Sequence, residues 1–224
     1  GNFTASKLAW VKEHEPSIFD KIKYVLLPGD FVSFQFTGNY TTTASALSEG
    51  ILWDFKNKTI ALDLISTYGF PSSIFPKSQP VFSDHGQILE PIASELGLSK
   101  DLIIGYKAGD QPNNALSLGV LNPGEIATTA GTSGVVYGVS DELKFDPQSR
   151  VNSFAHVNYS EDYTRIGVLM CINGTGILNR WLRQNFFADL SYGQMNNLAS
   201  NASIGAKGLI CIPFGNGSER IFQN

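Results

Sequence analysis

The sequence LIIGYKAGDQPNNALSL, residues 102–118, contains the local pattern that decides the fold class. Residues 102–106 form a short apolar run, which predicts a buried strand. Pro112 is favoured in the first turn of a helix, and residues 113–118 are expected to be helical. A strand that leads into a helix is a unit of an α/β fold, and this one delivers Asp110 at the carboxyl end of the strand.

Asp110 stands between Gly109 and Gln111, and it has two interpretations. The structural one is that Asp110 caps the helix after Pro112. The chemical one is that Asp110 accepts a hydroxyl proton, because a carboxylate at a helix start is held ionised by the helix dipole. Gly109 then lets the backbone approach a ligand, and Gln111 offers a donor and an acceptor to sugar hydroxyls. These neighbours favour a catalytic Asp110, with Asp110 and Gln111 binding the substrate.

A second loop rich in small residues, residues 128–134, also has two interpretations. It predicts a hairpin turn between strands at residues 125–129 and 135–139. It also has the composition of an anion-binding loop, because small residues expose backbone N–H groups and Thr132 and Ser133 add hydroxyls. No lysine follows the glycines, so the loop is not a Walker loop.

Strands and helices alternate along the rest of the chain, which extends the α/β prediction to both of its halves. A turn-rich joint at residues 121–124 separates residues 1–121 from residues 122–224. The other expected helices are residues 5–13, 31–36, 59–68, 88–96 and 176–183, and the other expected strands are residues 24–27, 165–170 and 209–212.

Composition argues against several classes of partner. Charged residues make up 16% of the chain, and the net charge is −4; an average soluble domain has about 25% charged residues. No basic stripe is present, so nucleic acid is not an expected partner. The longest apolar run, residues 166–172, is much shorter than the roughly 20 residues of a membrane-spanning helix. We therefore expect a soluble, cytoplasmic protein with no membrane partner.

Cysteine, histidine and asparagine patterns predict little chemistry of their own. Cys171 and Cys211 lie in apolar strand-like segments, which is typical of buried free thiols. The histidines are too dispersed for a metal site, and His156 is expected to be an interior residue. The Asn-x-Ser/Thr triplets leave a secreted glycoprotein open, but without a disulfide framework or a signal peptide they indicate only an Asn-rich composition.

Several modest segments form an ordered and more specific set. They are FTASKLAW (3–10), VLLPGD (25–30), AGDQ (108–111), GTSG (131–134), SFAH (153–156) and IPF (212–214) followed by GSER (217–220). The same order occurs in the FGGY carbohydrate kinases, and the chain resembles this family over essentially its whole length. Within the family, the resemblance is greatest to members that convert D-xylulose to D-xylulose 5-phosphate.

The resemblance implies an enzyme of the actin/hexokinase type, with two domains built on ribonuclease-H-like sheets that close on a sugar and Mg-ATP. Residues 1–121 match the C-terminal part of the sugar-binding domain, and residues 122–224 match the first part of the nucleotide-binding domain. Both domains are then incomplete. The implied cofactors are ATP and Mg²⁺, the implied partners are a small sugar and ATP, and a homodimer is compatible with the family.

Individual roles follow from the same resemblance. Asp110 matches the general base, and Gln111 matches the neighbour that hydrogen-bonds the sugar. Many family members that act on xylulose have Asn at that neighbouring position, whereas glycerol kinases have Gln, so the identity of the sugar stays open.

On the nucleotide side, the resemblance implies a second set of contacts. Gly131, Thr132 and the adjacent Ser133 match a loop that lies against the γ-phosphate. Gly174 and Gly176, ahead of Asn179, match a stretch that approaches the nucleotide phosphates.

The sequence leaves open other substrates and one other functional class. Ribulose, gluconate and glycerol are alternative substrates, because most of the sugar pocket and the first phosphate loop of the family are expected to precede residue 1. A non-catalytic actin-like module that binds sugar or nucleotide is the alternative from another functional class. Since part of the phosphate clamp is expected outside the 224 residues, this piece alone is expected to be inactive.

Overall fold

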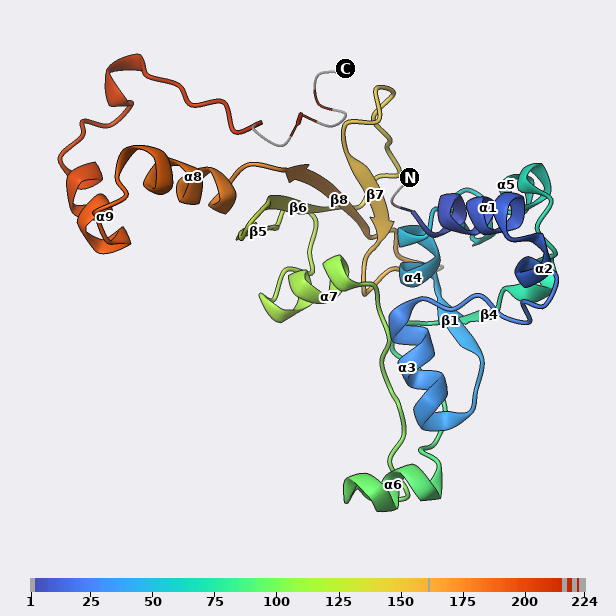
Figure 1. Ribbon diagram of the computed structural model, residues 1–224. Helices are drawn as coiled ribbons and strands as arrows, with labels where there is room; N and C mark the ends of the chain where they lie inside the picture. The colour runs from blue at the N-terminus through green and yellow to red at the C-terminus, as the bar shows by residue number, and fades with distance from the viewer. Residues whose placement is uncertain (1–2, 161, 215–216, 219–220, 222–224) are drawn as a thin grey trace. The chain divides into compact units, whose positions relative to one another are not determined.

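The computed structural model describes residues 3–160, 162–214, 217–218 and 221. The chain forms two compact units, which can be followed by residue number in Figure 1. Unit 1 comprises Gly1–Glu125, Gly138–Lys144 and Ser153–Val168; unit 2 comprises Ile126–Tyr137, Phe145–Asn152 and Leu169–Asn224. Glu219 and Arg220, from the last of the resembling segments, lie outside the described residues. The division into domains at residues 121 and 122 stays a prediction.

Unit 1 is built mainly from short helices. They are α1 (Thr4–His14), α2 (Pro16–Phe19), α3 (Pro28–Thr37), α4 (Ala44–Glu49), α5 (Leu62–Tyr68), α6 (Glu90–Leu96) and α7 (Asp110–Ser117). Its two-stranded sheets pair β1 (Thr41–Thr43) with β4 (Lys77–Gln79) in parallel, and β2 (Trp53–Asp54) with β3 (Thr59–Ile60) antiparallel. In the parallel pair Thr42 lies opposite Ser78.

One hydrophobic core joins the helices at the start of unit 1. In Figure 1, α1, α2 and α5 lie side by side. The buried members of the core are Ala5, Leu8, Phe19, Leu47, Leu52, Ile65, Phe70, Ile74 and Phe75. Since each large apolar side chain contributes roughly 1.5–3 kcal/mol when it is buried, this cluster fixes α4, whose other face carries functional residues described below.

Helix ends in unit 1 follow ordinary capping rules. α3 begins at Pro28 and ends at Gly38, which has the left-handed conformation (φ 73°). α5 ends at Gly69, and the Lys12 ammonium donates to the carbonyl oxygens of Tyr68 (2.6 Å) and Gly69 (2.8 Å). A cation at the C-terminal end of a helix is favourable because it opposes the helix dipole.

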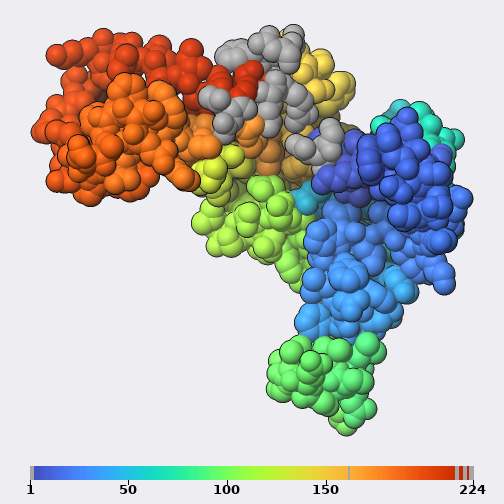
Figure 2. Space-filling model, in the orientation of Figure 1, coloured from blue at the N-terminus to red at the C-terminus, as the bar shows by residue number. Residues whose placement is uncertain are grey.

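Around α6, unit 1 carries exposed apolar side chains. Leu89, Leu96 and Leu98 are exposed there, and Figure 2 shows the segment around α6 standing out from the rest of the unit. Within the described residues, every helix is too short or too polar to cross a lipid bilayer.

The described part of unit 2 contains two α-helices, and its strands belong to a four-stranded sheet. The strands β5 (Ile126–Ala130), β6 (Gly134–Ser140), β7 (Asn152–Ala155) and β8 (Ile166–Ile172) lie in the order β5-β6-β8-β7. The helices are α8 (Gly176–Phe186) and α9 (Tyr192–Ser200). In α9 the Ser191 hydroxyl accepts from the backbone N–H of Gln194, and the Gln194 side chain accepts from that of Ser191, which forms a capping box.

Several predicted elements are confirmed in type. Helices cover most of residues 5–13, 31–36, 88–96 and 176–183, and strands cover most of residues 125–129, 135–139 and 165–170. His156 is fully buried, and its Nε2 lies 3.0 Å from the carbonyl oxygen of Val120.

Four predicted elements are wrong. Residues 24–27 form no strand, although the Val25 N–H donates to the carbonyl oxygen of Ile74. Residues 102–106 pair only through isolated bridges at Ile103 and Tyr106. Residues 59–68 divide into β3 and α5, because Thr59 and Ile60 pair with the preceding strand. Residues 209–212 form no strand, and their apolar side chains are exposed.

Because residues 209–212 form no strand, the prediction for Cys211 also changes. Cys211 is exposed because its segment does not join a sheet, so the predicted burial is wrong for it. Cys171 lies in β8 and is half-buried. Within the described residues, neither cysteine forms a disulfide bond.

Candidate functional site

Asp110 is the first residue of α7, and Gly109 precedes it as the N-cap residue. Gly109 has extended backbone angles (φ −67°, ψ 164°) and, as a glycine, has no side chain that could cap the helix. Asp110 is exposed and lies in the first turn of α7, where the helix dipole favours a negative charge. The interpretation of Asp110 as the N-cap is therefore wrong by one position, because the helix starts before Pro112.

The start of α7 is held by two side chains of α4. Ser45 and Glu49 are separated by four residues, so they lie on one face of α4. The Ser45 hydroxyl accepts from the N–H of Gly109 at 3.0 Å. The Glu49 carboxylate accepts from the N–H groups of Asp110 (Oε2, 3.3 Å) and Gln111 (Oε1, 3.3 Å). These bonds satisfy backbone donors that a helix N-terminus leaves without partners inside the helix.

Glu49 was not found from the sequence. The available signal was weak: Glu49 is the one charged residue between Asp30 and Asp54. A lone charge in an otherwise neutral, well-buried stretch needs a polar partner, but the sequence does not show which one.

The position of Glu49 explains why residue 109 is a glycine. A side chain at position 109 would overlap the carboxyl group of Glu49. On the Cβ side of Gly109 the space is filled by a carboxylate that binds the backbone, and the expectation that Gly109 makes room for a ligand stays a prediction.

The carboxyl groups of Glu49 and Asp110 influence each other. Burial raises the pKa of Glu49 to about 7, and the negative charge of Asp110 acts in the same direction. The hydrogen bonds from the backbone N–H groups of Gln111 and Asp110 lower that pKa and offset part of the increase. Glu49 therefore changes its charge near neutral pH.

A buried ion pair anchors the segment that leads into α7. The Lys107 ammonium lies 3.2 Å from Oδ1 of Asp30, and both side chains are almost fully buried. Lys107 also donates to the carbonyl oxygen and the hydroxyl of Thr41, each at 2.7 Å. The Thr42 hydroxyl donates to the second oxygen of Asp30 at 2.7 Å. Burial lowers the pKa of Lys107, while the charge of Asp30 opposes that change.

In unit 2, the predicted phosphate loop contacts the start of α8. The N–H groups of Gly176 and Ile177 donate to the carbonyl oxygens of Gly131 (2.8 Å) and Thr132 (3.2 Å). The Thr175 hydroxyl also donates to the carbonyl oxygen of Gly131, at 3.0 Å. A side chain at position 176 would overlap that oxygen. The structure thus brings Gly131 and Thr132 together with Gly176, and Ser133 adjoins them in the chain.

This loop keeps donors available for an anion. In the part of the chain that the structure describes, the N–H groups of Thr132 and Ser133 donate to no backbone carbonyl, and Thr132 is exposed. Backbone N–H groups and hydroxyls grouped in a loop are donors suited to phosphate oxygens. The residues present therefore fit a phosphate group.

The two remaining nucleotide-side residues lie apart from these loop contacts. A side chain at position 174 would overlap the carbonyl group of Pro213, so Gly174 lies against that segment. Asn179 lies one turn into α8 and lines a hollow of about 380 Å³ with residues of α9. Within the described chain, the backbone N–H of Asn179 donates to the carbonyl oxygen of Thr175 (3.2 Å) and not to the loop at residues 131–133.

Metal binding by side chains has little support in the described part of the chain. No three His, Cys, Asp or Glu residues come together there in a way that could hold a metal ion. Mg²⁺ commonly uses only one or two carboxylates together with substrate phosphates and water.

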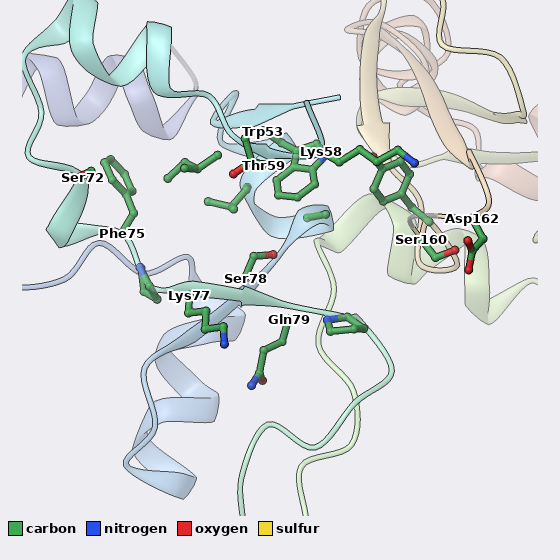
Figure 3. A pocket seen from close by; sticks show the side chains of 16 residues that line it. Trp53, Lys58, Thr59, Ser72, Phe75, Lys77, Ser78, Gln79, Ser160 and Asp162 are labelled. Atoms are coloured by element: carbon green, nitrogen blue, oxygen red, sulfur yellow. The ribbon is translucent and has the colours of Figure 1, made fainter. Parts of the chain in front are cut away.

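A cavity of about 680 Å³ in unit 1 lies apart from the predicted site residues (Figure 3). Trp53, Phe75 and Tyr159 give it aromatic walls. In Figure 3, Ser78 points to one side of β4, and Lys77 and Gln79 point to the other, as alternation along a strand requires. Asp110 and Gln111 are not among its lining residues. The sequence did not indicate this cavity, because its walls come from segments far apart in the chain.

Comparison with known proteins gives this geometry a family context. Residues 1–117 match the model of the "FGGY family of carbohydrate kinases, N-terminal domain". A xylulose kinase of Staphylococcus epidermidis is 30% identical over 212 residues, which cover 95% of this chain and 42% of that protein. The chain therefore spans about two-fifths of the length of that relative.

Solved structures agree on the fold. The crystal structure of a xylulose kinase from Rhodospirillum rubrum has a TM-score of 0.87 and 26% identity, covering 97% of this chain and 44% of that structure. A gluconate kinase from Lactobacillus acidophilus has a TM-score of 0.88 and 22% identity, covering 96% of this chain and 43% of that structure, and shows the fold alone. The architecture is the α/β, actin/hexokinase-like fold of these kinases, of which the chain forms a part. The chain belongs to the FGGY family of carbohydrate kinases.

Proposed function

We propose that the full-length protein containing this chain transfers a phosphoryl group from ATP to a sugar hydroxyl, and that its sugar is D-xylulose. The observation that carries the proposal is an exposed Asp110 at the start of α7, on a backbone held by Ser45 and Glu49. Membership of the FGGY family and the 30% identity to a xylulose kinase support the sugar and the reaction. The product is then D-xylulose 5-phosphate.

Asp110 is the proposed general base. Its carboxylate accepts the proton of the sugar hydroxyl as the oxygen attacks the γ-phosphorus, and the neighbouring Gln111 hydrogen-bonds the sugar. Phosphoryl transfer has a loose transition state, so the protein mainly positions the groups and provides this base. General-base assistance is typically worth about 10²- to 10⁴-fold in rate.

The nucleotide is proposed to bind through unit 2. The N–H groups and hydroxyls at Thr132 and Ser133 are donors for phosphate oxygens, and Gly131 and Gly176 keep the loop close to the start of α8. Gly174 and Asn179 are proposed to contact the nucleotide as well. When bound, Mg²⁺ neutralises the phosphate charge. Residues 122–224 are accordingly assigned to the nucleotide-binding domain, and residues 1–121 to the sugar-binding domain.

The side chain of Gln111 also supports a second substrate, gluconate. Gln111 offers a donor and an acceptor, and either a ketose or a sugar acid can use them. Gluconate is therefore the alternative substrate.

A panel of sugars tests the proposal. ADP release by the full-length protein is followed with D-xylulose, D-ribulose, gluconate and glycerol at matched concentrations. The proposal predicts the highest kcat/KM with D-xylulose. ADP release that no sugar stimulates would instead favour a binding module without catalysis.

A further inference from the structure

Glu49 contacts the start of α7 and has no role of its own in the proposed reaction. Three successive backbone N–H groups, at residues 109–111, donate to side chains of one short helix. The carboxylate of Glu49 takes two of them, with one oxygen for each. Such a fork fixes both the position and the direction of the first turn of α7, which carries Asp110.

The carboxyl group of Glu49 lies against the backbone of Gly109. At position 109 a side chain would overlap that carboxyl group, so the Glu49 side chain is in direct contact with the start of α7. On the preceding side, Lys107 is held by Asp30 and Thr41. The backbone around Asp110 is therefore anchored from both directions by buried or half-buried polar groups.

We propose that Glu49 is a positioning residue for the base Asp110, because its carboxylate holds the first turn of α7 through the N–H groups of Asp110 and Gln111. This inference rests on the proposed function, because it assumes that Asp110 acts as a base.

The ionisation of Glu49 makes this positioning dependent on pH. Asp110 is the charged side chain that acts on Glu49, while Ser45 and Ser48 on its own helix are neutral. When Glu49 is ionised, each of its oxygens accepts from one backbone N–H group, that of Asp110 or Gln111. When Glu49 is protonated, one of these oxygens carries the proton and is a weaker acceptor, so the first turn of α7 is held less firmly. The pKa of Glu49, about 7, places this change in the physiological range.

The test compares pH–rate profiles of the full-length protein. Glu49→Gln keeps the size of the side chain and one acceptor oxygen but removes the charge. We expect kcat to fall about 10- to 100-fold, since small displacements of a catalytic group are costly, while KM for the sugar changes less than threefold. The ratio of wild-type kcat to variant kcat should rise as the pH passes through about 7.

A matched control is available in the same unit. Glu125 also accepts from two backbone N–H groups, those of Leu121 (2.7 Å) and Asn122 (2.8 Å). Glu125→Gln removes an equivalent charge from a turn that carries no proposed catalytic group. Its kcat should stay near the wild-type value, and the ratio of its profile to the wild-type profile should be flat.

The outcomes separate this inference from the proposed function. If Asp110→Asn keeps wild-type kcat, the proposed function fails. If Asp110→Asn is inactive while Glu49→Gln keeps both the wild-type kcat and its pH dependence, the positioning inference alone is overturned. If Glu49→Gln does not fold, Ser45→Ala replaces it. That variant loses the bond to Gly109, and an unchanged kcat would equally overturn the positioning role.

Discussion

The carboxyl group of Glu49 fills the space that a side chain at position 109 would occupy. The two residues are far apart in the sequence, and their contact brings the end of α4 against the start of α7. Because Gly109 has ordinary extended backbone angles, its conformation does not require glycine. The requirement comes from the neighbouring carboxylate.

Gly109→Ala should therefore destabilise the protein through overlap with Glu49. The Glu49 carboxyl group is the end of a flexible side chain, so it should move away and release the N–H groups of Asp110 and Gln111. The loss of these bonds should cost about 1–3 kcal/mol and should lower kcat as well. Urea denaturation gives the free energy of unfolding. Gly105→Ala is the control, because a side chain at position 105 would meet no atom within 4 Å; equal losses for both variants would contradict the explanation.

The cost of Gly109→Ala should depend on Glu49. In the double variant Gly109→Ala, Glu49→Ala the overlap is absent, so the two changes should be less than additive, by about 1–2 kcal/mol. A double-mutant cycle of unfolding free energies measures this coupling. Strict additivity would mean that the two side chains do not compete for the same space.

Gly176→Ala should disrupt the junction of the loop at residues 131–133 with α8. The new side chain would overlap the carbonyl oxygen of Gly131, which already accepts from the Gly176 N–H at 2.8 Å. We expect a loss of about 1–3 kcal/mol in stability and weaker ATP binding by calorimetry.

Gly193→Ala provides the matched helical control for that change. Gly193 lies in α9, with the Ser191 hydroxyl oxygen as the nearest atom at 3.9 Å from a new side chain. Alanine is favoured over glycine in a helix by up to about 1 kcal/mol, so this variant should be as stable as the wild type or more so. Similar losses for Gly176→Ala and Gly193→Ala would refute the overlap.

Lys107→Met should be strongly destabilising, because it leaves the Asp30 carboxylate buried without its cation. Removing one partner of a buried ion pair costs about 3–5 kcal/mol. Arg150→Met breaks the pair that Arg150 forms with Asp146 (2.9 Å) at the surface, where little change is expected. Melting temperatures of the two variants make the comparison, and a Lys107→Met variant as stable as Arg150→Met would rule out a structural role for the buried pair.

Acid should destabilise unit 1 through its buried histidines. Burial lowers the pKa of His85 and of His156 below the ordinary value of 6.5. The folded state therefore keeps these rings neutral, and their contribution to stability is complete above pH 6.5 and is lost as the pH falls. Urea denaturation between pH 8 and pH 5 should show a smaller slope in His156→Gln than in the wild type. A slope in His156→Gln equal to that of the wild type would count against the assignment.

The sequence predicted local features of the site better than long-range ones. Asp110, the start of α7 and the loop at residues 131–134 were accessible because helix starts and glycine-rich turns depend on neighbouring residues. Glu49 was missed because its partners are about 60 positions further along the chain. The apolar runs at residues 24–27, 102–106 and 209–212 were assigned as strands, yet a strand also needs a hydrogen-bonding neighbour along its length. An apolar run alone does not specify that neighbour.

The most direct test of the account is the turnover of Asp110→Asn in the full-length protein with D-xylulose and Mg-ATP. The amide has nearly the size of the carboxylate, and Asp110 is exposed, so the circular dichroism spectrum and melting temperature should match the wild type. The account predicts a fall in kcat of about 10²- to 10⁴-fold with little change in KM. A folded Asp110→Asn protein that turns over D-xylulose at the wild-type rate would contradict it.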